Sequence, residues 1–243
     1  MFNNIPPITR NIIILNVVVF VLFLLLKNDA LYVQFAAFYP FSPYFKSWQI
    51  ITHMFMHGGY MHILFNMFTL YSFGPVLERT LGDRKYVILY FVSGLGAFFL
   101  FNAWNFIEVQ QIQASLESLG FNLNGFLQGE NAIFKGSTEA IMTQRELVGN
   151  LQSIINTPMV GASGAIFGVI AAFATLYPDA EIGIMFIPIP VKVKYVLPVI
   201  VVGSIILGVT GNVGGIAHLA HVGGAIVGFL LAKYWQGKLY RIN

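Results

Sequence analysis

The sequence predicts an all-α membrane protein with six transmembrane helices, on three observations. Hydrophobic residues make up 57% of the 243 positions and charged residues only 9%, against about 45–50% and about 25% in ordinary soluble domains. The mean hydropathy is +0.74. Apolar runs recur at close to the ~20 residues that a helix needs to cross the hydrocarbon core. Together these observations exclude a water-soluble globular domain.

Charge and cysteine content exclude further classes. The chain carries 13 basic and 10 acidic side chains, a net charge of +3. So weak an excess does not form the basic surface that binds nucleic acid. There is no cysteine, which excludes disulfides, thiolate metal sites and a cysteine nucleophile. The basic residues are therefore useful as markers of membrane topology.

Six apolar segments are expected to cross the membrane as helices. They cover residues 11–26, 57–77, 86–104, 159–177, 195–210 and 217–235. The first ends at Lys27 without a small-residue cleavage site, which predicts an uncleaved span and not a removed signal peptide. Proline and charge mark other ends, since Pro178 follows the fourth segment and Glu78 closes the second.

The distribution of lysine and arginine predicts the orientation, because cytoplasmic loops carry the excess of positive charge. With the N-terminus inside, nine of the 13 basic residues fall on the cytoplasmic side: Arg10, Arg79, Arg84, Lys85, Lys192, Lys194, Lys233, Lys238 and Arg241. Four fall outside, namely Lys27, Lys46, Lys135 and Arg145. Both termini are therefore expected in the cytoplasm, at a plasma or inner membrane.

Two segments between the spans are too long to be simple turns. Residues 27–56 are predicted to form an outer loop at the membrane interface, because their aromatic density is typical of interfacial segments. Residues 105–157 are the most polar part of the chain and predict a long extracytoplasmic insertion. Within it, residues 109–119 are expected to form a helix. With no internal repeat, 1–243 is expected to be a single membrane domain.

Four polar side chains inside the predicted spans stand out, because such residues are costly in a membrane and need a reason. They are His62 and Asn66 in the second span, Ser163 in the fourth and His221 in the sixth. Counted from the cytoplasmic ends at about 1.5 Å per residue, all four fall at roughly 18–24 Å, in one layer. His62 and Asn66 also share one helix face, because they are four residues apart.

These residue types suit nucleophilic acyl transfer. That chemistry needs a serine, a histidine that takes its proton, and groups that donate hydrogen bonds to the developing oxyanion. No carboxylate falls in the layer, so a serine–histidine dyad is predicted. Ser163 stands between Gly161 and Gly164 at the outer start of a helix, where unpaired N–H groups and the helix dipole favour negative charge. The motif departs from the hydrolase elbow G-x-S-x-G, because Ala165 replaces the last glycine.

Taken together, the motifs resemble those of the rhomboid intramembrane serine proteases. The matching stretches are residues 48–57 (WQIITHMFMH), 62–66 (HILFN), 78–82 (ERTLG), 161–168 (GASGAIFG) and 220–224 (AHVGG) with Gly228. The resemblance implies a six-transmembrane-helix rhomboid-like bundle. It also implies Ser163 as nucleophile, His221 as general base, and His62, Asn66 and the Ser163 amide as oxyanion donors.

Other residues of these motifs have supporting interpretations. Phe167 follows Ser163 by one turn and is expected to pack on the ring of His221, without offering a hydroxyl. His57 is expected to form hydrogen bonds beneath the outer loop. Small residues allow neighbouring helices to approach closely, and this role is expected for Gly161, Gly164, Gly224 and Gly228.

Three further positions have a more ordinary interpretation. Gln49 stands where the family often has arginine, which puts the loop hydrogen bonds of that arginine in doubt. His53 is interpreted as interfacial and His218 as structural. The spacing of His53, His57 and His62 is a weak metal-ligand pattern without a carboxylate. No metal and no organic cofactor are therefore expected.

The predicted function is that of an endopeptidase that cuts a peptide bond in or beside a transmembrane segment. A substrate helix is expected to enter from the lipid and unwind, because its backbone must be exposed for cleavage. The expected partners are transmembrane protein substrates and membrane lipids, not nucleic acid, and the oligomeric state is left open. The main alternative is an inactive rhomboid-like protein that binds membrane clients and is expected to lack Ser163 or His221. A transporter is disfavoured, since paired repeats and broken helices are not found.

Overall fold

The architecture is mostly helical. A computed structural model describes residues 5–129, 131–184, 187–210 and 218–239 of the chain. The helices are α1 (Pro7–Leu26), α2 (Asp29–Phe35), α3 (Gln49–Thr52), α4 (Tyr60–Leu81), α5 (Asp83–Ser118), α6 (Leu123–Leu127), α7 (Thr138–Asn156), α8 (Ser163–Leu176), α9 (Val193–Thr210) and α10 (His218–Leu239). A 3₁₀ turn (His53–Phe55) follows α3, and β1 (Glu181–Ile184) pairs antiparallel with β2 (Ile187–Lys192).

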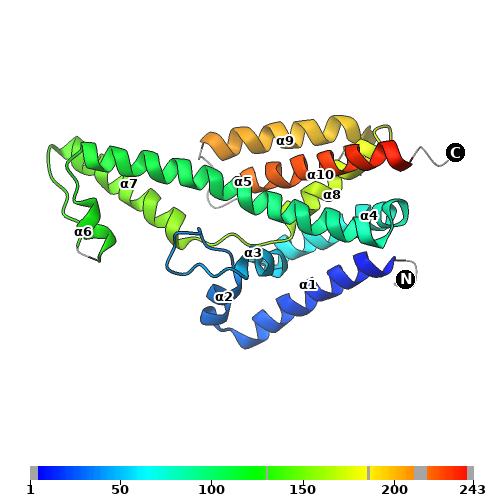
Figure 1. Cartoon of the computed structure of the whole chain (residues 1–243), viewed down its shortest axis with the longest axis horizontal. Coiled ribbons are helices and arrows are strands. Elements are labelled where there is room, and N and C mark those ends of the chain that lie inside the picture. The colour runs from blue at the N-terminus through cyan, green and yellow to red at the C-terminus, as the bar shows by residue number, and fades with distance from the viewer. Residues whose placement is uncertain (1–4, 130, 185–186, 211–217, 240–243) are drawn as a thin grey trace.

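Six of these helices, α1, α4, α5, α8, α9 and α10, run roughly along the long axis of the molecule (Figure 1). Helix α8 is central, because it contacts α4, α5, α9 and α10, and Val169, Ala171 and Ala172 within it are fully buried. The start of α1, the turn between α4 and α5 and the end of α10 lie at one end of the bundle (Figure 1). Helices α6 and α7 project from the opposite end.

Helix α5 is much longer than the predicted third span of residues 86–104. It continues without a break to Ser118, so the helix expected within residues 109–119 is present up to Ser118, as a continuation of the third span. The reason is local: residues 105–118 contain neither proline nor glycine to end the helix. At 36 residues the helix measures about 54 Å, well beyond the ~30 Å of a hydrocarbon core. Its outer part therefore projects from the bundle.

Helix α8 is shorter than the predicted fourth span of residues 159–177. It begins only at Ser163 because Gly161, at φ +118, adopts a conformation that a right-handed helix does not contain. Its 14 residues cover about 21 Å, less than the bilayer core. The chain before Ser163 therefore crosses part of the bundle without helical hydrogen bonds.

Length and composition identify two of the described helices as candidate membrane spans, where the sequence predicted six. These are α1 and α5. The apolar stretches Ser163–Leu176 and Val193–Gly203 are shorter. The predicted sixth span starts at residue 217, which lies outside the described residues. Arg241 and the end of the chain also lie outside them, and part of the predicted orientation depends on these residues.

Glu78 caps a different helix from the one that contains it. The sequence suggested that Glu78 closes the second span, but its side chain is buried, with 1% exposed, inside α4. Its carboxylate accepts hydrogen bonds from Ile8 N at 2.8 Å, Thr9 N at 2.7 Å and Thr9 Oγ1 at 2.6 Å. The first turn of a helix has unpaired N–H groups and a positive dipole end. Glu78 therefore accepts hydrogen bonds from the otherwise unpaired N–H groups at the start of α1, and it joins α1 to α4.

Helices α8 and α10 pack backbone to backbone through glycine. A Cβ atom placed on Gly228 would lie 2.6 Å from the carbonyl carbon of Gly168, and one placed on Gly224 would lie 2.8 Å from that of Gly164. These distances leave no room for a side chain. The close approach matters because Ser163 begins α8 and His221 lies near the start of α10.

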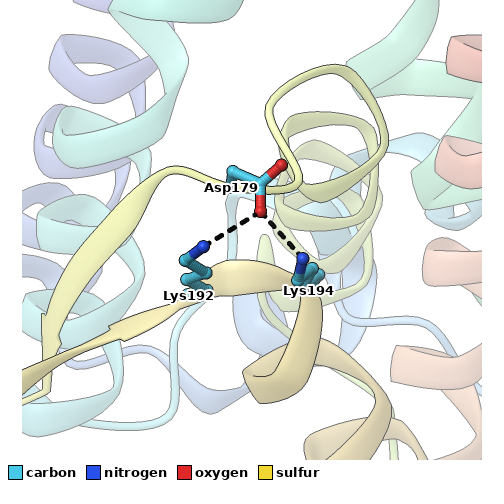
Figure 2. A network of polar contacts seen from close by, with 3 residues as sticks. All are labelled: Asp179, Lys192 and Lys194. Carbon is cyan, nitrogen blue, oxygen red and sulfur yellow. Dashed lines mark hydrogen bonds and ion pairs between the residues drawn. The ribbon is translucent and has the colours of Figure 1, made fainter.

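An exposed ion-pair network ties the end of α8 to the start of α9 (Figure 2). Asp179 accepts hydrogen bonds from Lys194 Nζ at 2.8 Å and from Lys192 Nζ at 3.3 Å. The bonds from Lys194 and then Lys192 lower the pKa of the Asp179 carboxyl. Because the Asp179 side chain is 65% exposed, solvent screens the pair and its contribution to stability is small. The network therefore links the two segments at the surface and adds little to the stability of the bundle.

The packing of α8 on α10 predicts that Gly228→Ala destabilises the protein. The added methyl group must push the two helices apart, at a cost of about 1–3 kcal/mol for overpacking. Gly237→Ala is the matched control on the same helix, since a Cβ there meets nothing within 4 Å, and alanine is favoured over glycine in a helix by about 0.5–1 kcal/mol. Thermal unfolding in detergent compares the two, and equal stability would contradict the close contact.

Candidate active site

Ser163 is the first residue of α8 and lines a cavity in the bundle. The three residues Gly161, Ala162 and Ser163 form the turn into the helix, called here the catalytic turn. At the start of a helix the backbone N–H groups have no intrahelical partner. The Ser163 side chain and these N–H groups therefore lie on the same turn.

The segment before the catalytic turn is held by the outer loop. Met159 and Ala37 exchange two backbone hydrogen bonds, of 2.7 and 3.0 Å, and Gly161 N donates to His53 O at 2.9 Å. Non-helical backbone is tolerated at membrane depth only where protein or water satisfies it. No local signal in the sequence indicates these partners, because the bonds join residues more than a hundred positions apart. Only Pro158 and Gly161 indicated that helix is disfavoured there.

His221 lies on α10, and its Nε2 is 3.0 Å from Ser163 Oγ. This is a normal hydrogen-bond length. The ring of His221 stacks on that of Phe167, with centroids 4.2 Å apart and planes within 2° of parallel. Phe167 lies one turn after Ser163 on α8. The stack fixes the plane of the imidazole, so that its Nε2 faces the serine.

His62 and Asn66, one turn apart on α4, both approach the catalytic turn. A Cβ atom placed on Gly161 would lie 2.6 Å from His62 Nε2 and 3.7 Å from Asn66 Nδ2. Glycine at this position therefore lets both side chains approach the backbone. Asn66 is buried, with 7% exposed, and its Nδ2 has no hydrogen-bond partner within the described residues. A buried donor without a partner is unusual and calls for a ligand or water.

The remaining histidines surround this group. His57 packs against His62, with ring centroids 5.0 Å apart, but neither of its nitrogens meets a hydrogen-bond partner in the described parts of the chain. The hydrogen-bonding role expected for His57 stays a prediction. His53 is buried, with 2% exposed, and is not the interfacial residue that the sequence suggested. His218 is buried with its ring centroid 6.2 Å from that of His221.

Gln49 organises the outer loop, which answers the doubt that its replacement of arginine raised. Its side chain is fully buried. The Oε1 atom accepts from Phe38 N at 3.3 Å and Lys46 N at 3.1 Å. The Nε2 atom donates to Val33 O at 2.9 Å and Tyr44 O at 3.1 Å. A neutral amide thus both donates to and accepts from the loop backbone, which a guanidinium, a donor only, does not do.

The glycines of the motifs have separate roles. Gly161 faces His62, as described above. Gly164 packs against Ala97 of α5 and, with Gly224, at the crossing of α8 and α10. Gly228 lies further along the same crossing. Gly224 and Gly228 therefore shape the bundle that carries the site, and neither is among its lining residues.

The cavity has a volume of about 910 Å³ and is lined by α4, α5, α8, α10, the 3₁₀ turn, and residues 58–59 and 158–161. Its polar groups include Ser163, His221, His62 and Asn66, and most of its surface is apolar. Among the described residues that line it, none is aspartate or glutamate. Within the described residues, no group of three histidine, cysteine, aspartate or glutamate side chains is placed to hold a metal ion. The arrangement offers a hydroxyl, an adjacent imidazole and nearby donors, which suits acyl transfer at an apolar substrate.

Comparison with known proteins gives the family of the chain. The family model described as the Rhomboid domain matches residues 44–236. Rhomboid protease GlpG from Klebsiella pneumoniae subsp. pneumoniae is 33% identical over 93 residues, which cover 38% of this chain and 34% of the relative. The protein of the same name from Salmonella choleraesuis is 35% identical over 91 residues, 37% of this chain and 32% of the relative.

A plant relative extends the match along the chain. RHOMBOID-like protein 4 from Arabidopsis thaliana is 27% identical over 186 residues, which cover 76% of this chain and 33% of the relative. The matches thus span about a third of the length of these relatives. The Rhomboid domain itself takes in most of this chain, from the outer loop into α10. This protein therefore belongs to the rhomboid family, whose members are integral membrane proteins.

Proposed function

We propose that this protein is an intramembrane serine endopeptidase that uses Ser163 and His221 as a catalytic dyad. The observation that carries the proposal is the 3.0 Å separation of Ser163 Oγ and His221 Nε2 inside a mostly apolar cavity. The resemblance of the two motifs to those of rhomboid proteases supports it, as does the family membership. The substrates are transmembrane proteins.

In the proposed first step, Ser163 Oγ attacks the carbonyl carbon of the scissile peptide bond, and His221 Nε2 takes the hydroxyl proton. The carbonyl oxygen becomes negatively charged. Asn66 Nδ2, His62 and the Ser163 N–H donate hydrogen bonds to this oxyanion. Asn66 suits the role because its Nδ2 is buried and meets no partner among the described residues.

The second step breaks the peptide bond. His221 gives its proton to the leaving nitrogen, the C–N bond breaks, and the acyl group stays on Ser163 Oγ as an ester. Water then attacks the ester while His221 takes one of its protons. When the ester bond breaks, that proton returns to Ser163 Oγ, and the product leaves as a carboxylic acid. Stacking on Phe167 keeps the imidazole in one plane through both steps.

We further propose that α1, α4, the inner part of α5, α8, α9 and α10 are six membrane spans of one domain. Although α1 precedes the matched residues 44–236, its bonds to Glu78 make it part of the bundle. The start of α1 and the end of α10 lie at one end of the bundle (Figure 1), which we assign to the cytoplasm from the basic residues. The membrane is a plasma or inner membrane. The outer loop, residues 27–56, and residues 105–157 then lie outside.

The first prediction concerns the dyad. Ser163→Ala and His221→Ala are each expected to abolish cleavage of a model transmembrane substrate, because either change removes the activated nucleophile. Reconstitution in liposomes and separation of the products on gels measures cleavage. A serine-reactive fluorophosphonate is expected to label Ser163 in the unaltered protein.

His218→Asn is the matched control for the dyad, since it alters a second buried histidine of α10 whose ring lies near His221. It is expected to retain cleavage. Normal cleavage by a folded Ser163→Ala variant would instead favour a client-binding protein or an unrelated contaminating protease. Loss of activity only in the His218 variant would show that His218, and not His221, is the general base.

The oxyanion donors give a kinetic prediction. Asn66→Ala and His62→Ala are each expected to lower kcat by about 10²–10³-fold, as removal of one preorganised donor typically does. KM is expected to change little, because the donors act once charge develops. Thr69→Val is the control, since Thr69 lines the same cavity on α4. Unchanged turnover in both folded variants would leave Asn66 and His62 as packing residues.

The topology is tested with single cysteines, which is direct because the chain has none. A membrane-impermeant thiol reagent applied to intact cells or spheroplasts is expected to label Ser137→Cys, at the start of α7. It is expected to label Asp83→Cys, at the turn into α5, only after the membrane is opened. Both residues are exposed, so the reverse pattern would invert the proposed orientation.

A further inference from the structure

The projecting helices form a small structure with its own core. We call residues 104–129 and 131–156, which comprise the outer half of α5, α6, α7 and their connections, the arm. Its buried residues are Val109, Ile112, Leu116, Phe121, Leu123, Val148 and Leu151. The fully buried Gln144 donates to Leu119 O and Lys135 O at 3.1 and 2.9 Å, which closes the turn between the two long helices. The arm is thus a packed unit and not a loose loop.

A residue of the outer loop completes this core. Tyr39 is 5% exposed and belongs to the same cluster as the buried residues of α5 and α7. Phe41 also joins the outer loop to α5, because its ring centroid is 5.5 Å from that of Tyr39 in the loop and 6.1 Å from that of Phe106 on α5. The arm therefore holds the outer loop at residues 39–41.

The same stretch of loop holds the chain that leads to Ser163. Ala37, two residues before Tyr39, makes the paired backbone bonds to Met159. Phe38, between them, donates its N–H to the buried side chain of Gln49. The arm core, Tyr39, Ala37 and Met159 thus form a continuous series of packed or hydrogen-bonded groups that ends four residues before the nucleophile.

The arm also reaches the catalytic turn through the chain itself. Helix α7 ends at Asn156, and only residues 157–162 separate it from Ser163. The arm therefore approaches this segment from two sides, by covalent connection and by way of the outer loop. In a serine–histidine dyad the position of Ser163 Oγ relative to His221 decides the rate, and a misplacement of about 1 Å can cost about 10²-fold.

We propose that the arm positions the catalytic turn and that Tyr39 is the positioning residue that connects them. The inference rests on the proposed protease function. The core of the arm holds the outer loop in position, and the loop in turn holds the extended segment before Ser163. The alternative hypothesis is that the arm is a solvated appendage with no effect on the rate of the reaction.

The experiment compares Tyr39→Ala with Leu151→Ala, a change at the fully buried centre of the arm on α7. Each is expected to lower kcat by about 10- to 100-fold with KM changed less than about threefold, because the substrate cavity keeps its walls. The rate of fluorophosphonate labelling at Ser163 is expected to fall in parallel. The double variant is expected to be no slower than the slower single one, since both changes interrupt the same connection.

Two controls separate positioning from loss of folding. Tyr39→Phe keeps the ring in the core and is expected to restore turnover. Met142→Ala changes an arm residue that is 68% exposed and is expected to leave kcat unaltered. Thermal unfolding of each variant gives the folded fraction at the assay temperature.

The outcomes distinguish this inference from the function on which it rests. Unaltered kcat and labelling in Tyr39→Ala, full additivity in the double variant, or losses that match the unfolded fraction would each overturn the positioning role. If the unaltered protein cleaves no substrate, the proposed protease function fails, while the labelling rates still test whether the arm positions Ser163.

Discussion

The approach of α8 to α10 through glycine is the constraint on which the site depends. Helices that meet through larger side chains keep their axes about 8–10 Å apart. Here the Gly164–Gly224 and Gly168–Gly228 contacts bring backbone against backbone. Ser163 directly precedes the first of these contacts on α8. The short serine side chain can therefore reach His221, at 3.0 Å, without a change in either helix.

The second constraint is that Ser163 begins a helix that is shorter than the membrane. The extended backbone before it needs hydrogen-bond partners at depth, and Ala37 and the His53 carbonyl supply them. These partners must themselves be fixed, which explains why the buried amide of Gln49 holds several loop segments at once. The outer loop is therefore part of the support of the site and not only an interfacial anchor.

The sequence predicted the helical class, the rhomboid resemblance and the residues that meet at the cavity, because apolar length and buried polar residues are local signals. It did not predict which groups would pair across long separations. Glu78 was expected at the end of its own span, yet its partners Ile8 and Thr9 are about 70 positions away. The predicted fourth span also starts four residues before α8 does, since the length of an apolar run does not reveal where extended backbone finds partners.

In the proposed mechanism, the apolar setting also accounts for a dyad in place of a triad. An aspartate at this depth would have to be buried as a charge, which is costly in a membrane unless it is paired. A carboxylate normally orients the histidine, but a parallel aromatic ring performs that task without charge. Phe167 meets the requirement because helical spacing from Ser163 places it against His221, at 4.2 Å between centroids. The same helix then supplies both the nucleophile and the surface that orients its base.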